Sequence, residues 1–247
     1  MKSFVSRGVM AAAFALSAAT MAVPAAAQEK SGVRPSFETA QIAGEKIVLF
    51  QPDVKVGAQS TAGMFEPRAE WTEEAKRLMD AELKRKQASL SNELIDMPET
   101  YGENAQMVAE YQALFNTVAA SIVQYQFFPG NRLPTRKKGD FDWTLGSETQ
   151  RLAELTGARY GLFITTEDQY GSTGRKLLQF AAAGLLGAAV QSGVHVGYAG
   201  LVDLQTGNIV WLNADAQMGG DVREEDGMKK RVGQLLEDFP GSRSDKD

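Results

Sequence analysis

The chain has 247 residues, with 26 Lys and Arg against 31 Asp and Glu, one His and no Cys. The formal net charge of -5 argues against a nucleic-acid-binding protein, which needs a basic face to displace counterions. The absence of Cys excludes disulfides, thiolate zinc sites and cysteine nucleophiles, so the hydrophobic core must hold the fold without covalent links.

Residues 1–27 have the pattern of a signal peptide that is cleaved on export. Lys2 and Arg7 give a positive start, an apolar stretch follows over 9–23, and three alanines at 25–27 provide a small-residue cleavage site. We therefore expect an exported protein of the bacterial periplasm. Because the chain has no Cys to accept a lipid, we expect it not to be lipidated.

The N-terminal half alternates between apolar runs and polar stretches. Residues 28–44 lack a sustained period, which predicts a flexible leader before a single domain over 45–240. Within that domain, hydrophobic periodicity and helix-capping signals predict a strand at 46–50, a long loop at 54–70, a helix at 72–87 beginning with Thr72 as its cap, a strand at 94–97 and a helix at 104–125.

The C-terminal half has stronger turn signals. Ser147 and Gln150 have the spacing of a capping box, and Gly157 is suited to end the short helix that they open. Gly207 lies between two apolar strands, which predicts a β-hairpin. In chain order the patterns predict a strand at 160–166, hairpin strands at 194–204 and 208–212, a last helix capped by Asp221, and a disordered tail at 241–247.

This order predicts an α/β or α+β fold, with a single mixed sheet, packed helices and a C-terminal β-hairpin. An apolar Gly/Ala-rich helical insertion at 177–190 interrupts the strands of that sheet. It has no charged residue, and as a helix it would extend about 21 Å, short of the about 30 Å needed to cross a bilayer. Three interpretations stay open: a buried crossover helix, a segment that inserts into lipid, and a self-association face.

Two short segments carry a family resemblance. Gly157, Ala158 and Tyr160, within 155–163, resemble the helix-to-strand element of envelope proteins related to the curli secretion channel and the Tol-system translocation protein N-terminal domain. Residues 202–210 resemble the hairpin that follows it there. The resemblance implies a shared α/β scaffold and no particular activity. The chain lacks the lipidation Cys and the paired membrane hairpins of channel-forming members, so a curli-type pore is not expected.

Four residues are candidates for enzymatic chemistry: Glu167, Asp168, His195 and Asp203. Adjacent carboxylates on a strand point to opposite faces, so Glu167 and Asp168 are poorly placed to cooperate. His195 has no Ser, Cys or second His at a useful spacing, which favours a histidine on a sheet face over a general base or a metal ligand. We therefore expect no enzyme, catalytic site, cofactor or metal; an envelope hydrolase using these residues is the alternative.

The expected role is protein–protein contact in envelope assembly or secretion, with an envelope protein or a second copy as partner. The apolar insertion supplies the candidate contact residues, for an interface or for a membrane surface: Leu178, Phe180, Leu185 and Leu186. A peripheral membrane protein that inserts residues 177–190 is a further alternative, and no nucleic-acid partner is expected.

Overall fold

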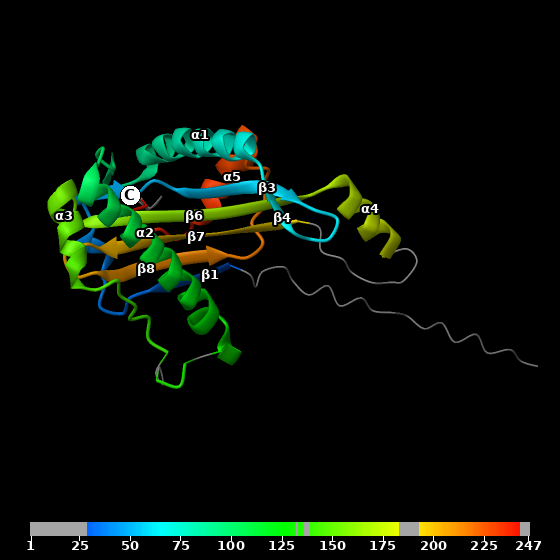
Figure 1. Cartoon of the computed structure of the whole chain (residues 1–247). Helices are drawn as coiled ribbons and strands as arrows, with labels where there is room; N and C mark the ends of the chain where they lie inside the picture. The colour runs from blue at the N-terminus through cyan, green and yellow to red at the C-terminus, as the bar shows by residue number, and fades with distance from the viewer. Residues whose placement is uncertain (1–28, 132, 136–138, 183–192, 243–247) are drawn as a thin grey trace, which may run out of the picture.

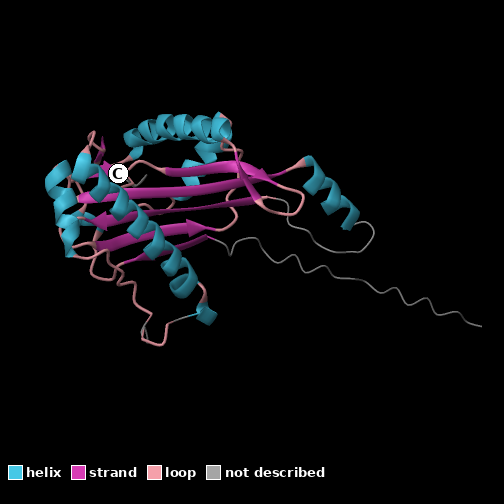
Figure 2. Cartoon of the chain, viewed as in Figure 1, coloured by secondary structure: helices cyan, strands magenta, loops and turns pink. Residues whose placement is uncertain are grey.

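The computed structural model describes residues 29–131, 133–135, 139–182 and 193–242. These residues form one mixed sheet with helices on both faces (Figures 1 and 2). The predicted signal peptide lies outside the described residues. Every described helix is too short or too polar to span a bilayer.

The sheet has eight strands in the order β1-β8-β7-β6-β2-β5, with β3 paired to the far half of β6 and β4 paired to β3. Strands β2, β3 and β5 run parallel to β6 or to each other, and the remaining pairs are antiparallel. The strands are β1 Glu29–Val33, β2 Lys46–Leu49, β3 Asp53–Gln59, β4 Phe65–Pro67, β5 Glu93–Asp96, β6 Tyr160–Gly171, β7 Val194–Asp203 and β8 Asn208–Asp215.

Side chains that alternate along the strands feed two separate cores, one on each face of the sheet. The helices are α1 Ala69–Lys86, α2 Gly102–Ile122, α3 Gln150–Thr156, α4 Thr173–Ala181 and α5 Glu225–Leu235. Helices α1 and α5 cover the face that holds Ile47 and Trp211. Helices α2 and α3 cover the opposite face, where Phe163 stacks between Phe50 and Phe115 at centroid distances of 4.0 and 4.6 Å.

The predicted α/β class, the single mixed sheet and the hairpin at Gly207 are confirmed. Helices α1 and α2 and strand β5 lie where the pattern placed them, within a few residues. Thr72, however, is not the cap of α1, which begins three residues earlier. Its hydroxyl instead exchanges hydrogen bonds with the backbone N–H and C=O of Val56, each at 3.1 Å, and so ties α1 to β3.

The expected flexible leader is wrong for residues 29–33, which form the edge strand β1. This strand pairs antiparallel with β8 from Glu29 opposite Asp215 to Val33 opposite Trp211. The segment shows no alternating pattern because its described side chains are mostly exposed, on both faces of the strand. Gly32 also leaves space where the ring of Phe141 packs against the backbone.

The predicted loop at 54–70 is wrong as well, because it contains β3 and β4. Val54 and Val56 are buried in the α1/α5 core, while the glycines that suggested a loop serve the sheet. Gly57 lies so close to the backbone of Glu66 that a Cβ there would collide with its carbonyl oxygen. Pro67 ends the short edge strand β4, a position that proline tolerates.

The other two predicted N-terminal caps, Ser147 and Asp221, also differ from the structure. A single 3-10 turn, η5 Ser147–Thr149, precedes α3, and Gly146 rather than Ser147 occupies its N-cap position. Helix α5 begins at Glu225, because Asp221 hydrogen-bonds with Arg223 instead of capping the helix. Gly157 does end α3 in the left-handed conformation, with φ 67°. In the predicted tail, the Gly241 carbonyl accepts hydrogen bonds from Ser91, and residues 243–247 lie outside the described part.

Candidate functional site

The sheet brings two of the four predicted chemical residues together and separates the others. Asp168 on β6 and His195 on β7 are directly opposite in the antiparallel register, on the face covered by α5. Glu167 points to the other face, as expected, and accepts a hydrogen bond from Gln169 at 2.6 Å. Asp203 lies at the far end of β7, 3.6 Å from the Arg159 guanidinium.

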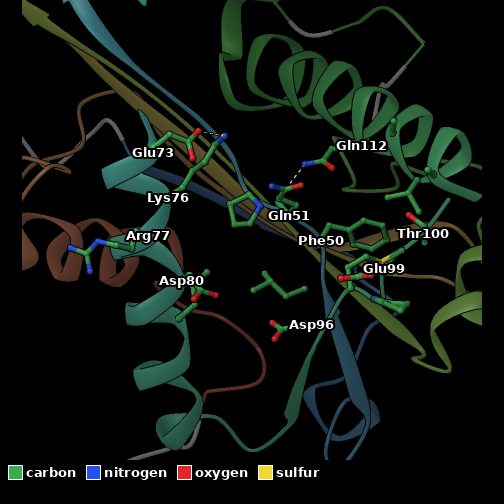
Figure 3. Close-up of a pocket in the computed structure, with 18 residues that line it drawn as sticks. Phe50, Gln51, Glu73, Lys76, Arg77, Asp80, Asp96, Glu99, Thr100 and Gln112 are labelled. Atoms are coloured by element: carbon green, nitrogen blue, oxygen red, sulfur yellow. Dashed lines mark hydrogen bonds and ion pairs between the residues drawn. The ribbon is translucent and has the colours of Figure 1, made fainter. Parts of the chain in front are cut away.

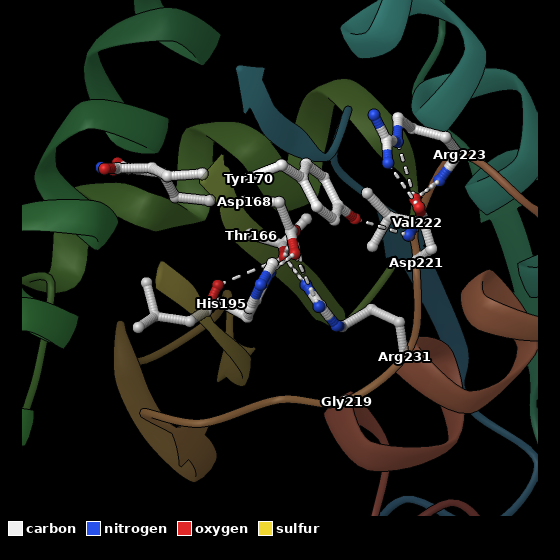
Figure 4. A network of polar contacts seen from close by, with 12 residues as sticks. Thr166, Asp168, Tyr170, His195, Gly219, Asp221, Val222, Arg223 and Arg231 are labelled. Carbon is white, nitrogen blue, oxygen red and sulfur yellow. Dashed lines mark hydrogen bonds and ion pairs between the residues drawn. The ribbon is translucent and has the colours of Figure 1, made fainter. Parts of the chain in front are cut away.

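Asp168 is the centre of a buried polar network (Figure 4). Arg231 on α5 is also fully buried and donates to both carboxylate oxygens, Nη1 to Oδ2 at 2.6 Å and Nη2 to Oδ1 at 2.7 Å. The Nδ1 of His195 lies 2.7 Å from Oδ1. Arg231 Nη1 also donates to the Thr166 hydroxyl at 2.5 Å. The network therefore joins α5 to β6 and β7.

The charges of this network balance within the protein. Burial by itself raises the pKa of Asp168, but the hydrogen bonds from His195 and Arg231 outweigh it and hold that pKa below its usual range. Asp168 is thus an ionised carboxylate neutralised by a bidentate guanidinium. Such a pair fixes helix position, and breaking it leaves an uncompensated buried charge.

The Asp168–His195 pair has one feature of a hydrolytic triad, a carboxylate that orients an imidazole through Nδ1. Within the described residues, however, no hydroxyl is hydrogen-bonded to the imidazole Nε2 of His195. Neither His195 nor Asp168 lines any of the three described cavities. The arrangement favours a structural role for the pair.

An outer group of side chains covers this network. The Arg223 guanidinium lies 3.9 Å from the Tyr170 ring centroid and 4.4 Å from that of Trp71, and it pairs with Asp221 at 2.5 Å. The Tyr170 hydroxyl accepts a hydrogen bond from the Val222 N–H at 3.0 Å. The turn that precedes α5 is therefore held against β6 and α1.

The Asp221–Arg223 pair should make stability depend on acid. Hydrogen bonding by Arg223 lowers the pKa of Asp221 to about 2, against about 3.9 for an unperturbed Asp. Because the folded-state pKa is depressed, the stabilisation is complete above pH about 4 and is lost as the pH falls toward about 2. Urea unfolding should show wild type falling more steeply than Asp221→Asn across that window. Parallel curves would contradict the assignment.

The largest described cavity, about 770 Å³, lies outside the carboxyl ends of the parallel strands β2 and β5 (Figure 3). The chain passes from β2 through β3 and β4 to α1 on one face, and from β5 to α2 on the other face, so the cavity opens between the two helices. In open α/β sheets, ligands bind outside the carboxyl ends of neighbouring strands whose connections continue to opposite faces of the sheet. No sequence signal identified it, because its residues come from four separate segments.

Charged side chains surround this cavity, and several are already paired. Lys76 contacts Glu73 at 3.1 Å, Arg77 contacts Glu74 at 2.6 Å, and Asp80 contacts Lys84 at 2.9 Å. In the described parts of the chain, no three His, Cys, Asp or Glu residues gather closely enough to hold a metal ion. The cavity therefore suits an organic ligand better than a metal.

A second cavity of about 470 Å³ lies at the C-terminal end of α2 and its π-helical extension, η3 Val123–Phe127. Its walls are mostly apolar. They comprise Lys30, Ala120, Val123, Gln124, Phe127, Phe128, Asn131, Val196, Gly197, Tyr198, Ala214, Asp215 and Ala216.

Helix α4 carries the described part of the predicted contact segment. It leaves the end of β6 and projects beyond the sheet (Figure 1). The Ser172 hydroxyl caps it by accepting from the Arg175 N–H at 3.2 Å, and the Arg175 side chain donates to the Thr61 carbonyl at 3.3 Å. Leu177 and Leu178 are 64% and 43% exposed.

The crossover interpretation of 177–190 is wrong, because β6 and β7 are antiparallel neighbours and need no crossover connection. The exposed leucines also exclude burial of the start of this segment in the chain's own core. The Phe180 side chain and residues 183–192, which include Leu185 and Leu186, lie outside what the structure describes. The interface and membrane interpretations therefore apply to a segment that begins with the projecting helix α4, whose first turn is anchored to the rest of the chain.

No family model matches this chain, and no curated protein matches it in sequence. Among solved structures it is similar to two PelC dodecamers from Paraburkholderia phytofirmans, at 11% and 10% identity and TM-scores of 0.37 and 0.36, covering 87% of this chain and 98% of each PelC chain. It is also similar to the lipoprotein GNA1162 from Neisseria meningitidis, at 14% identity and TM-score 0.32, over 79% of this chain and 99% of that one.

These TM-scores are below the level that indicates a shared fold, so the similarities assign neither a family nor a function to the chain. None of these three structures is a curli channel or a Tol protein. The more specific resemblance based on residues 155–163 and 202–210 stays a prediction.

Proposed function

We propose that this chain is an exported, non-enzymatic envelope protein that acts by contact with a second copy of itself through helix α4. The observation that supports this proposal is the exposure of Leu177 and Leu178 on a helix that projects from the sheet. Adjacent exposed leucines in an apolar segment are typical of an interaction surface. The segment that follows them in the sequence stays free of charge to residue 190.

The anchoring of α4 also supports a contact role. The Ser172 cap and the Arg175 hydrogen bond to Thr61 hold the first turn of the helix against the β3–β4 turn. A preorganised helix binds a partner with less loss of conformational entropy than a free loop does. A second copy is the favoured partner because it presents the same apolar helix, and a two-fold pairing would bury both copies of the leucines.

The non-enzymatic part of the proposal predicts that His195 is dispensable. Arg231 still binds both oxygens of Asp168 in a His195→Gln variant, and the His195 side chain is 29% exposed, so the fold should tolerate the change. A strain that expresses His195→Gln in place of the wild-type protein should behave like wild type in every trait that deletion of the protein changes. A loss equal to deletion, with the variant folded, would favour the hydrolase alternative.

Sedimentation of the mature chain distinguishes a protein partner from a lipid surface. We expect mass to increase with protein concentration in buffer alone, and little protein to pellet with vesicles of phosphatidylethanolamine and phosphatidylglycerol. A monomer at all concentrations that pellets with the vesicles would replace self-association with membrane insertion. A protein that stays monomeric at all concentrations and does not pellet with the vesicles would contradict the proposed self-association through α4.

A further inference from the structure

The cavity between α1 and α2 is built as a ligand site that is independent of the proposed contact surface. Leu49 of β2 and Asp96 of β5 are register partners, so both strands end side by side at its floor. A volume of about 770 Å³ lies within the range of small-molecule sites, roughly 300–1,000 Å³. Strand β2 pairs with the first residues of β6, whereas α4 follows the last residue of β6, so the cavity at the end of β2 lies away from α4 (Figure 1).

The inner wall of the cavity is apolar and only partly filled. Leu49 at the end of β2, Met97 and Val108 are half-buried in its lining, and Phe50 is fully buried behind them. The α2 side is lined by Ala105 and Ala109, whose short side chains leave the space open. Apolar surface that the chain itself does not cover provides binding energy for an apolar ligand group.

The charged groups at the mouth are predominantly acidic. Four carboxylates line the cavity against two bases, Lys76 and Arg77, and both bases are held by glutamates of α1. Among the described residues, Asp96 and Glu99 form no ion pair. Glu99 Oε2 accepts a hydrogen bond from the Tyr101 hydroxyl at 2.7 Å, and Asp96 interacts at longer range with Lys84, which is itself paired with Asp80. Figure 3 shows Asp96 and Glu99 beside the apolar interior, on the side away from Lys76. The potential at this side of the mouth therefore favours a positive charge.

We propose that this cavity binds a small organic cation with an apolar body, an amine whose ammonium group lies between Asp96 and Glu99 and whose apolar part contacts Leu49, Met97 and Val108. The chemistry follows from the position of two carboxylates without an ion-pair partner next to an apolar wall that the chain covers only in part. An anion of the same shape would meet the same wall but would be repelled at the mouth.

A matched pair of probes tests the proposal on the mature chain. We expect isothermal titration calorimetry to show 4-phenylbutylamine binding at least about tenfold more tightly than 4-phenylbutyrate, which has the same apolar body and the opposite charge. Equal affinities, tighter binding of the carboxylate, or no binding of the amine would each overturn the proposal.

Variants separate the two halves of the site. Asp96→Asn with Glu99→Gln should weaken amine binding about fivefold, while Glu110→Gln, an exposed change of charge on α2 outside the lining, should not. Ala109→Trp should abolish binding by filling the apolar part, with no change in the urea midpoint because Ala109 is exposed. Full amine binding by Ala109→Trp, or an equal loss in Glu110→Gln, would contradict the assigned site.

Discussion

Replacing Arg231 with methionine should destabilise the protein by about 3–5 kcal/mol. The substitution keeps most of the side-chain volume but leaves the Asp168 carboxylate buried with only His195 and Thr166 as polar neighbours. An unpaired buried carboxylate loses its solvation without compensation. Urea denaturation followed by far-UV circular dichroism at pH 7 measures the effect.

The double variant Asp168→Leu with Arg231→Met is the matched control, because it removes both charges together. We expect it to recover most of the stability lost in Arg231→Met, since an apolar pair can replace a buried ion pair at little cost. His195→Gln should lose much less than Arg231→Met. A double variant no more stable than Arg231→Met would show that packing around α5, rather than an unpaired charge, caused the loss.

Replacing Gly207 with alanine should also cost several kcal/mol, about 3 or more. Gly207 has φ 74° in the turn between β7 and β8, and a Cβ there would lie 1.9 Å from the Gly146 carbonyl oxygen. This backbone contact cannot be relieved by a rotamer change, so the β7–β8 turn and the chain before α3 must separate. Thermal unfolding reports the loss.

Gly157→Ala separates the two causes of that loss. Gly157 has a similar φ of 67° at the end of α3, but nothing lies within 4 Å of a Cβ built there. It should therefore lose only the cost of a left-handed alanine, about 1 kcal/mol. Equal losses in Gly157→Ala and Gly207→Ala would mean that backbone conformation alone explains both, and that the close approach to Gly146 contributes nothing.

The sequence predicts elements well where one face of the element is buried. The stripe of α2 and the hairpin at Gly207 place apolar residues at regular intervals, so their period identifies them. The sequence does not reveal strands β1 and β3, because a glycine in each strand interrupts the alternation of side chains by which a strand is recognised. Gly32 leaves space for the ring of Phe141, and Gly57 leaves space for the backbone of Glu66.

The polar network is only half visible in the sequence. His195 and Asp168 stand out as candidates, but their contact depends on the register of β6 with β7, which are separated in the sequence by residues 172–193. Arg231 carried a usable signal. It lies on the buried face of α5 with Met228, Val232 and Leu235, and a charge in an apolar stripe requires a buried partner.

The contact residues on α4 could also be predicted only in part. A run without charge indicates a surface that some partner must cover, but periodicity does not show whether the chain itself supplies it. The antiparallel pairing of β6 with β7 excludes the crossover, and the exposure of Leu178 shows that the chain's own core leaves it uncovered.

Sedimentation velocity of two leucine variants tests whether the chain self-associates through α4. Leu178 on α4 and Leu114 on α2 are similarly exposed, 43% and 40%, so aspartate at either position should leave the fold intact. Burying one leucine contributes about 1.5–3 kcal/mol, so Leu178→Asp should weaken self-association more than tenfold and leave a monomer at concentrations where wild type and Leu114→Asp assemble. Assembly of Leu178→Asp at the wild-type concentration would contradict a contact through α4.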